Sequence, residues 1–174
     1  MEKRSDSWLQ KAFHYGEMCC VNKNVIIKVI GSQMVDQDTN RIELETEGKY
    51  YKKGSSYYIT YRESEVTGLQ GTTTTLKVSE SVITLMRFGT INSQLVFEQG
   101  QKHISHYDTI HGAFTIGVIA NTVDINVNDS GGEIRVDYQL ELDNAEVGVN
   151  DFIMQIREAG RPNDEHSGES QTGN

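Results

Sequence analysis

The sequence predicts an all-β protein, an antiparallel up-and-down barrel of about eight to ten strands. Short segments that alternate apolar and polar residues recur from Val25 to Glu158, and turn residues, mainly glycine and asparagine, separate them. No segment between them has the period and length of a crossover helix. Because a meander must protect its edge strands, closure into a barrel is the favoured solution and a β-sandwich is the alternative.

The predicted strands follow from the alternation of side chains along the chain. Their positions, in order, are Val25–Gln33, Arg41–Lys52, Tyr57–Ser64, Thr72–Ser79, Ile83–Phe88, Gln94–Phe97, Lys102–Thr109, Ala113–Asn121, Val123–Asn128, Glu133–Leu142 and Glu146–Glu158. The threonine run after Gly71 is β-branched and favours a strand. Asn128 to Gly132 is the strongest turn signal, and Gly89, Gly100 and Gly112 mark other connections.

The chain is expected to hold one domain, residues 21–158, between two dissimilar ends. Residues 1–20 contain Trp8, Leu9, Ala12 and Phe13 at helical spacing, which allows a short amphipathic helix. This segment is either a helix that caps one barrel end or an extension before a natural start near Val21. Residues 159–174 hold no bulky apolar residue, so a disordered polar tail is expected.

Composition narrows the classes of partner and compartment. The 174 residues carry a net charge of −9, which disfavours general binding to nucleic acids or anionic membranes. No apolar run reaches the length of a membrane span, and residues 1–20 lack the apolar region of a secretory signal. The two cysteines, Cys19 and Cys20, are adjacent and cannot form a disulfide framework. A cytoplasmic monomer or homodimer is expected.

Arg87 is the foremost candidate for a binding residue. It continues the apolar face of Ile83 and Leu85, so its guanidinium is expected in or near the barrel mouth. Arginine there can bind a carboxylate or phosphate through two hydrogen bonds. Alternatively, it forms an internal ion pair, with Glu63 as the expected partner, because an unpaired buried charge is too costly.

Several hydroxyl-bearing side chains share the faces that are expected to point inward. They are Tyr61, Thr74, Tyr107, Thr109 and Tyr138. An apolar interior with a few such groups is typical of ligand pockets. It is equally typical of packed cores in which neighbours satisfy the tyrosine hydroxyls, and the sequence leaves both interpretations open.

Two other patterns point to chemistry less strongly. Glu63 and Glu65 lie two apart on a predicted strand, roughly 7 Å from each other on one face, where a carboxylate pair can act as acid and base. A solvated rim is the simpler interpretation, and no catalytic residue is assigned.

A second pattern, formed by His103, His106, Asp108 and His111, resembles a metal-binding motif. On a strand, however, His103 and His106 point to opposite faces, and a metal site needs ligands that converge. Neither a metal nor a cofactor is therefore predicted.

Scattered motifs resemble the YwiB-like family of uncharacterised bacterial proteins. They are Tyr58-x-x-Tyr61-x-Glu63, Gly71–Thr75, Lys77-Val78, Leu85-x-Arg87-x-Gly89, Phe97-x-x-Gly100 and Tyr107-x-Thr109-x-x-Gly112. The similarity covers about residues 22–158. It implies a calycin-type, lipocalin-like barrel, and it implies no activity, cofactor or catalytic residue. His111 stands where the family pattern favours an aromatic residue.

Three functions from different classes remain open at this stage. The first is a barrel that binds a small, partly apolar and anionic ligand at Arg87. The second is a filled barrel that serves as a structural or interaction module. The third, and least favoured, is a hydrolytic or isomerising enzyme that uses Glu63; an enzyme is the less expected class.

Overall fold

The computed structural model describes residues 22–35, 38–109 and 111–160. These residues form one closed antiparallel barrel with the strand order β1-β10-β9-β8-β7-β6-β5-β4-β3-β2. The strands are β1 (Lys23–Val35), β2 (Asp38–Lys53), β3 (Ser56–Arg62), β4 (Thr73–Val78), β5 (Val82–Phe88), β6 (Asn92–Glu98), β7 (Lys102–Thr109), β8 (Gly112–Asn128), β9 (Gly131–Leu142) and β10 (Ala145–Glu158). The predicted all-β barrel is confirmed.

Closure depends on the pairing of the first strand with the last. β1 pairs with β10 from Val25↔Glu158 to Met34↔Val149, and with β2 on its other side. The β-sandwich alternative is therefore wrong. The described residues contain no α-helix, only the 3-10 helix η1 (Glu65–Thr67). Residues 1–20, for which a short helix was considered, lie outside the described part.

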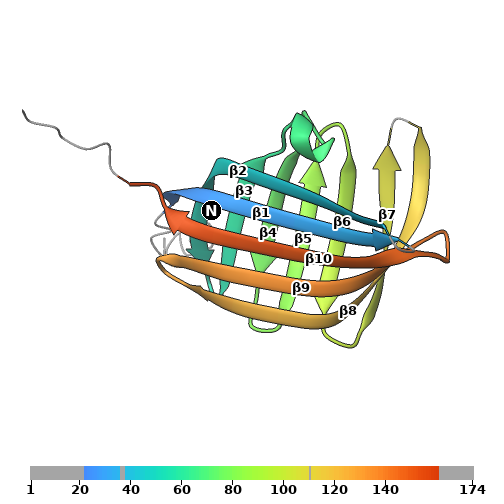
Figure 1. Ribbon diagram of the computed structural model, residues 1–174. Helices are drawn as coiled ribbons and strands as arrows, with labels where there is room; N and C mark the ends of the chain where they lie inside the picture. The colour runs from blue at the N-terminus through green and yellow to red at the C-terminus, as the bar shows by residue number, and fades with distance from the viewer. Residues whose placement is uncertain (1–21, 36–37, 110, 161–174) are drawn as a thin grey trace, which may run out of the picture.

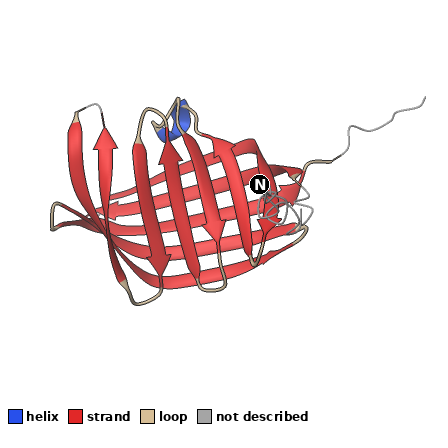
Figure 2. Ribbon diagram, turned by 180° about the vertical axis from the view of Figure 1, so that it is seen from behind, coloured by secondary structure: helices blue, strands red, loops and turns tan. Residues whose placement is uncertain are grey.

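The barrel is built from two groups of strands that run in different directions. The long strands β1, β8, β9 and β10 cross one side, and the short strands β3 to β7 stand upright on the other (Figure 1). The reverse view shows the same crossing, with η1 above the upright strands (Figure 2). Each strand is amphipathic, because alternate residues point into the barrel.

Two predicted boundaries were wrong. The segments 113–121 and 123–128 are one strand, β8, with an irregularity in its pairing to β9 between Ala120 and Thr122. A bulge adds a residue and bends a strand without ending it, which explains the broken alternation near Asn121. The strand expected to reach Ser64 ends at Arg62, and Glu65 already belongs to η1.

Two stacked tyrosines lie at the end of the barrel that carries the β8–β9 turn. Tyr50 and Tyr57 stack with ring centroids 5.4 Å apart. The Tyr50 hydroxyl donates to the Asn128 carbonyl (2.7 Å) and the Tyr57 hydroxyl to Asp129 Oδ1 (2.8 Å). These bonds tie β2 and β3 to the β8–β9 turn, so we call this the closed end. Gly48 of β2 lies in the same half, where a Cβ atom would stand 2.7 Å from the Thr60 carbonyl oxygen.

Candidate functional site

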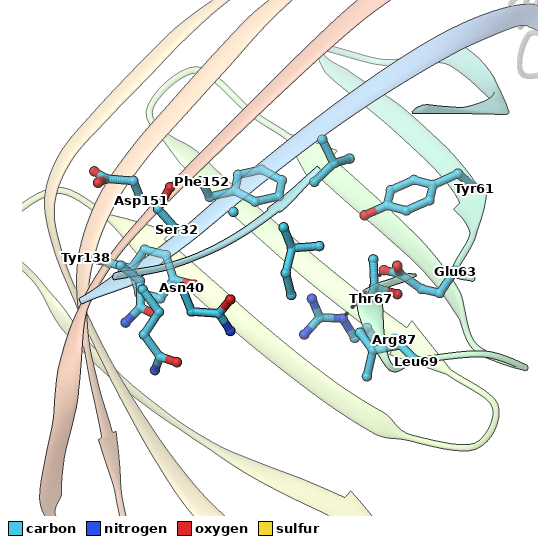
Figure 3. Close-up of a pocket in the computed structure, with 15 residues that line it drawn as sticks. Ser32, Asn40, Tyr61, Glu63, Thr67, Leu69, Arg87, Tyr138, Asp151 and Phe152 are labelled. Atoms are coloured by element: carbon cyan, nitrogen blue, oxygen red, sulfur yellow. Dashed lines mark ion pairs between the residues drawn. The ribbon is translucent and has the colours of Figure 1, made fainter. Parts of the chain in front are cut away.

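The opposite end of the barrel holds a cavity of about 230 Å³. We call it the Arg87 cavity. Its lining comes from the ends of β1, β2, β3, β5, β9 and β10 and from η1 and the loop that follows it (Figure 3). The lining residues are Val29, Gly31, Ser32, Gln33, Asn40, Ile42, Tyr61, Glu63, Thr67, Leu69, Arg87, Tyr138, Asn150, Asp151 and Phe152. Apolar walls with a few polar groups are typical of small-molecule sites.

Arg87 extends from β5 into this cavity. Its side chain is 21% exposed, and its terminal nitrogens point toward the middle of the cavity (Figure 3). Arg87 Nε is buried and has no hydrogen-bond partner among the described residues. A buried guanidinium nitrogen without an acceptor is costly, so Arg87 can gain from an incoming acceptor.

Glu63 lies beside Arg87 at the end of β3. Its Oε1 is 3.9 Å from Arg87 Nε, at the limit of an ion pair and too far for a hydrogen bond. The side chain of Glu63 is only 2% exposed, and Thr74 Oγ1 donates a 2.5 Å hydrogen bond to Oε1. The carboxylate therefore stabilises the guanidinium electrostatically and leaves its N–H donors without this acceptor.

Two tyrosine hydroxyls share the polar part of the cavity. Burial, followed by the charge of Glu63, raises the pKa of Tyr61 well above its usual value. Burial also raises the pKa of Tyr138, while the Arg87 charge acts in the opposite direction. Both phenols therefore stay protonated at neutral pH and can donate hydrogen bonds.

The structure gathers part of the predicted binding set. Tyr61, Glu63, Arg87 and Tyr138 line the cavity, and Thr74 is fully buried behind it, bonded to Glu63. Tyr107 is half-buried and packs against the core without lining the cavity. Thr109 ends β7 opposite Gly112, and its side chain lies outside the described part.

The predicted carboxylate pair does not form. Glu63 is buried, whereas Glu65 is exposed on η1, because the strand that would have put both on one face has already ended. The two carboxylates therefore do not face each other, and the predicted acid–base pair is absent from this part of the structure.

The histidine pattern does not converge. His103 is half-buried and its Nε2 lies 3.0 Å from Glu98 Oε2, while His106 is exposed on the other face of β7. Asp108 is also exposed. Among the described residues, no group of three His, Cys, Asp or Glu side chains is placed to hold a metal ion.

Sequence reasoning missed the amide side chains of the cavity, which are Gln33, Asn40 and Asn150. Asn150 is buried, and its side-chain amide donates to the Gly148 carbonyl (3.2 Å). It shares its face of β10 with Phe152, Met154 and Ile156, so the alternation alone could have placed it inside. Asn40 lies one residue before the predicted strand start at Arg41. It has the same parity as Ile42 and Leu44, so extending that alternation by one residue would have placed it on the inward face.

Comparison with known proteins identifies the family. The family described as "Domain of unknown function (DUF1934)" matches residues 27–154. A curated relative, "Uncharacterized beta-barrel protein YwiB" of Bacillus subtilis (strain 168), is 26% identical over 111 residues, which are 63% of this chain and 77% of the relative. The crystal structure of the ywiB protein from Bacillus subtilis superposes with a TM-score of 0.68 at 19% identity, over 80% of this chain and 94% of that one, and shows the same fold. None of the helices in the described part could cross a membrane. The chain therefore belongs to the DUF1934 family, the YwiB-like β-barrel proteins.

Proposed function

We propose that this protein binds a small, partly apolar ligand with a carboxylate or similar anionic group, held by Arg87 inside the barrel. The observation that carries the proposal is the Arg87 guanidinium, whose buried Nε has no acceptor among the described residues. Its end points into the cavity, which Tyr61 and Tyr138 also line. A ligand anion there would accept charge-assisted hydrogen bonds, which are stronger than neutral ones.

The surroundings of Arg87 support the same assignment. Arg87 pairs across the sheet with Thr74 on β4 and Ser93 on β6. Thr74 is committed to Glu63, but Ser93 Oγ is buried and has no partner among the described residues. Neither neighbour therefore satisfies Arg87 Nε, and Ser93 itself does not line the cavity, so the guanidinium is the donor that a ligand oxygen would meet.

The size and walls of the cavity limit the ligand. About 230 Å³ is below the range of roughly 300–1,000 Å³ that holds drug-sized molecules, so a small acid fits better than a long acyl chain. Val29, Ile42, Leu69 and Phe152 supply the apolar contacts. A barrel with such a ligand would act as a calycin-like carrier or sensor. We place it in the cytoplasm as a monomer or homodimer, with no role in binding nucleic acid or membranes.

A panel of small aliphatic and aromatic carboxylates tests the proposal, each compared with its primary amide of matching shape. Isothermal titration should show carboxylates preferred over amides. Arg87→Gln should weaken carboxylate binding about tenfold to a hundredfold, as expected for lost charge-assisted hydrogen bonds. Arg157→Gln is the matched control, because Arg157 is 66% exposed and lies near the end of β10, away from the cavity.

Two results of these titrations would contradict recognition of an anion by Arg87. Equal affinity for acids and amides would show that no anion is recognised. Unchanged binding by Arg87→Gln, or equal losses in Arg87→Gln and Arg157→Gln, would remove Arg87 from the site.

A further inference from the structure

Within the described part of the chain, one edge of the second half of β8 has no partner strand. β7 pairs with β8 from Lys102↔Ile119 to Thr109↔Gly112, and nothing in the described part continues this ladder past the bulge. From Thr122 to Asn128, β9 is the only strand of the described part that pairs with β8, and at the far end of this stretch the Asn128 carbonyl also accepts from the Tyr50 hydroxyl. Strand edges offer a row of backbone donors and acceptors to any extended chain that approaches.

β6 does not close this edge. The ladder between β6 and β7 has two residue pairs, Asn92↔Asp108 and Ser93↔Tyr107. The end of β6 turns toward the bulge instead, where Gln99 bridges to Ala120 and the Gly100 N–H donates to the Ala120 carbonyl (2.9 Å). This contact ends where the unpaired edge of β8 begins.

A groove of about 380 Å³ runs beside the unpaired edge. Glu80 and Ser81 of the β4–β5 turn and Glu98 and Gln99 at the end of β6 form one wall, and Val123–Ile125 forms the other. Val123 and Ile125 are half-buried and pack on the barrel core, whereas Asp124 between them is exposed. Successive side chains of an added strand would therefore lie alternately beside these apolar residues and beside the carboxylates.

The charge around the groove selects the partner. Glu80, Glu98 and Asp124 supply three carboxylates. Arg135 lies opposite Asp124 on β9, but its guanidinium is hydrogen-bonded to Glu133, and His103 lies beside Glu98. A second copy of this chain would bring the same carboxylates into an antiparallel edge-to-edge contact, and like charges directly opposite are destabilising.

We infer that the β8 edge binds an extended peptide segment of a basic partner, in which Lys or Arg residues alternate with apolar residues. The segment pairs with Thr122–Asn128 as an added strand. Its backbone supplies the hydrogen bonds, and its alternate side chains contact the apolar wall and the three carboxylates.

Three ten-residue synthetic peptides test this with the full-length protein. The first alternates lysine with valine and threonine, the second replaces each lysine by glutamate, and the third methylates two consecutive central amides of the first. Consecutive amides face opposite edges of a strand, so the third peptide keeps its charge and cannot pair on either edge. Fluorescence anisotropy measures binding, and amide hydrogen exchange by NMR locates it.

The lysine peptide should bind and protect amides within Thr122–Asn128 from exchange. The glutamate peptide and the methylated peptide should each bind at least about tenfold more weakly than the lysine peptide. The double variant Asp124→Lys/Glu98→Lys should lose binding, while Glu65→Lys/Glu146→Lys, with the same charge change at exposed sites near the opposite end, should keep it. A melting curve verifies that each variant is folded.

Several outcomes would overturn the inference. Undiminished binding of the methylated peptide would show charge attraction without strand pairing, and protection elsewhere would place the site on another surface. Absence of binding to all three peptides would exclude the partner class. Self-association that protects Thr122–Asn128 without peptide would assign the edge to a second copy. None of these results depends on the Arg87 cavity.

Discussion

Replacing Arg87 by leucine should destabilise the barrel, because it leaves the buried Glu63 carboxylate without its neighbouring positive charge. Two unit charges 3.9 Å apart attract by about 4 kcal/mol at an effective dielectric constant of 20. Removing one partner of a fully buried pair costs about 3–5 kcal/mol. Arg87 is 21% exposed and Thr74 continues to bond Glu63, so a loss of about 2–3 kcal/mol is expected.

A double-mutant cycle separates the charge effect from lost packing. Glu63→Gln keeps an acceptor for Thr74 and removes the charge, so Arg87→Leu in that background should cost about 1–2 kcal/mol less than in the wild type. Urea unfolding followed by circular dichroism gives each free energy of unfolding. A coupling energy below about 0.5 kcal/mol would refute the reasoning, because it would mean that the two side chains do not sense each other in the folded protein.

Other predictions concern the closed end, the glycine contact, the chain ends and the histidines. Burial raises the pKa of three of the seven tyrosines in the described part, so stability present below about pH 10 should be lost as pH rises further. Absorbance at 295 nm should show late ionisation of Tyr50, Tyr61 and Tyr138, and simultaneous titration of every tyrosine would contradict this. Gly48→Ala should lower the free energy of unfolding by about 1–3 kcal/mol in urea titrations, because its Cβ would meet Thr60 and Ile27, and an unchanged value would disprove the close contact. Deleting residues 1–20 and 161–174 should preserve the cooperative thermal transition, since the closed ladder needs β1 to β10 alone; a large fall in melting temperature would show that an end packs on the barrel. Dialysis against a chelator should leave the melting temperature unchanged, and stoichiometric zinc in elemental analysis would contradict the metal-free assignment of the histidines.

The barrel was predictable because apolar and polar residues alternate regularly along its strands. The face that begins with Ile83 and Leu85 is buried as expected, and Arg87 follows it inward. Period alone cannot reveal a bulge, since one added residue at Asn121 looks the same as the end of a strand. For the same reason the sequence did not show that β8 continues past β7 and that one edge of its second half has no partner strand among the described residues.

The site was predictable only in part, because a cavity is set by where strands end. Arg87 and Glu63 were placed together by their parity on two predicted strands, although β3 ends at Arg62, one residue before Glu63. Glu65 was misplaced, since η1 begins before the alternation can continue. Asn40 was missed because the predicted strand begins at Arg41, whereas β2 begins at Asp38 and carries Asn40 to the cavity in phase with Ile42.

Native mass spectrometry of the protein purified from its own host tests the central claim most directly. Wild-type protein should retain a small acid, seen as an added mass that is released on denaturation, and Arg87→Gln should be recovered without it while Arg157→Gln keeps it. Wild-type protein that carries no added mass and binds none of the carboxylates in the panel would contradict the account, as would an adduct that Arg87→Gln retains in full.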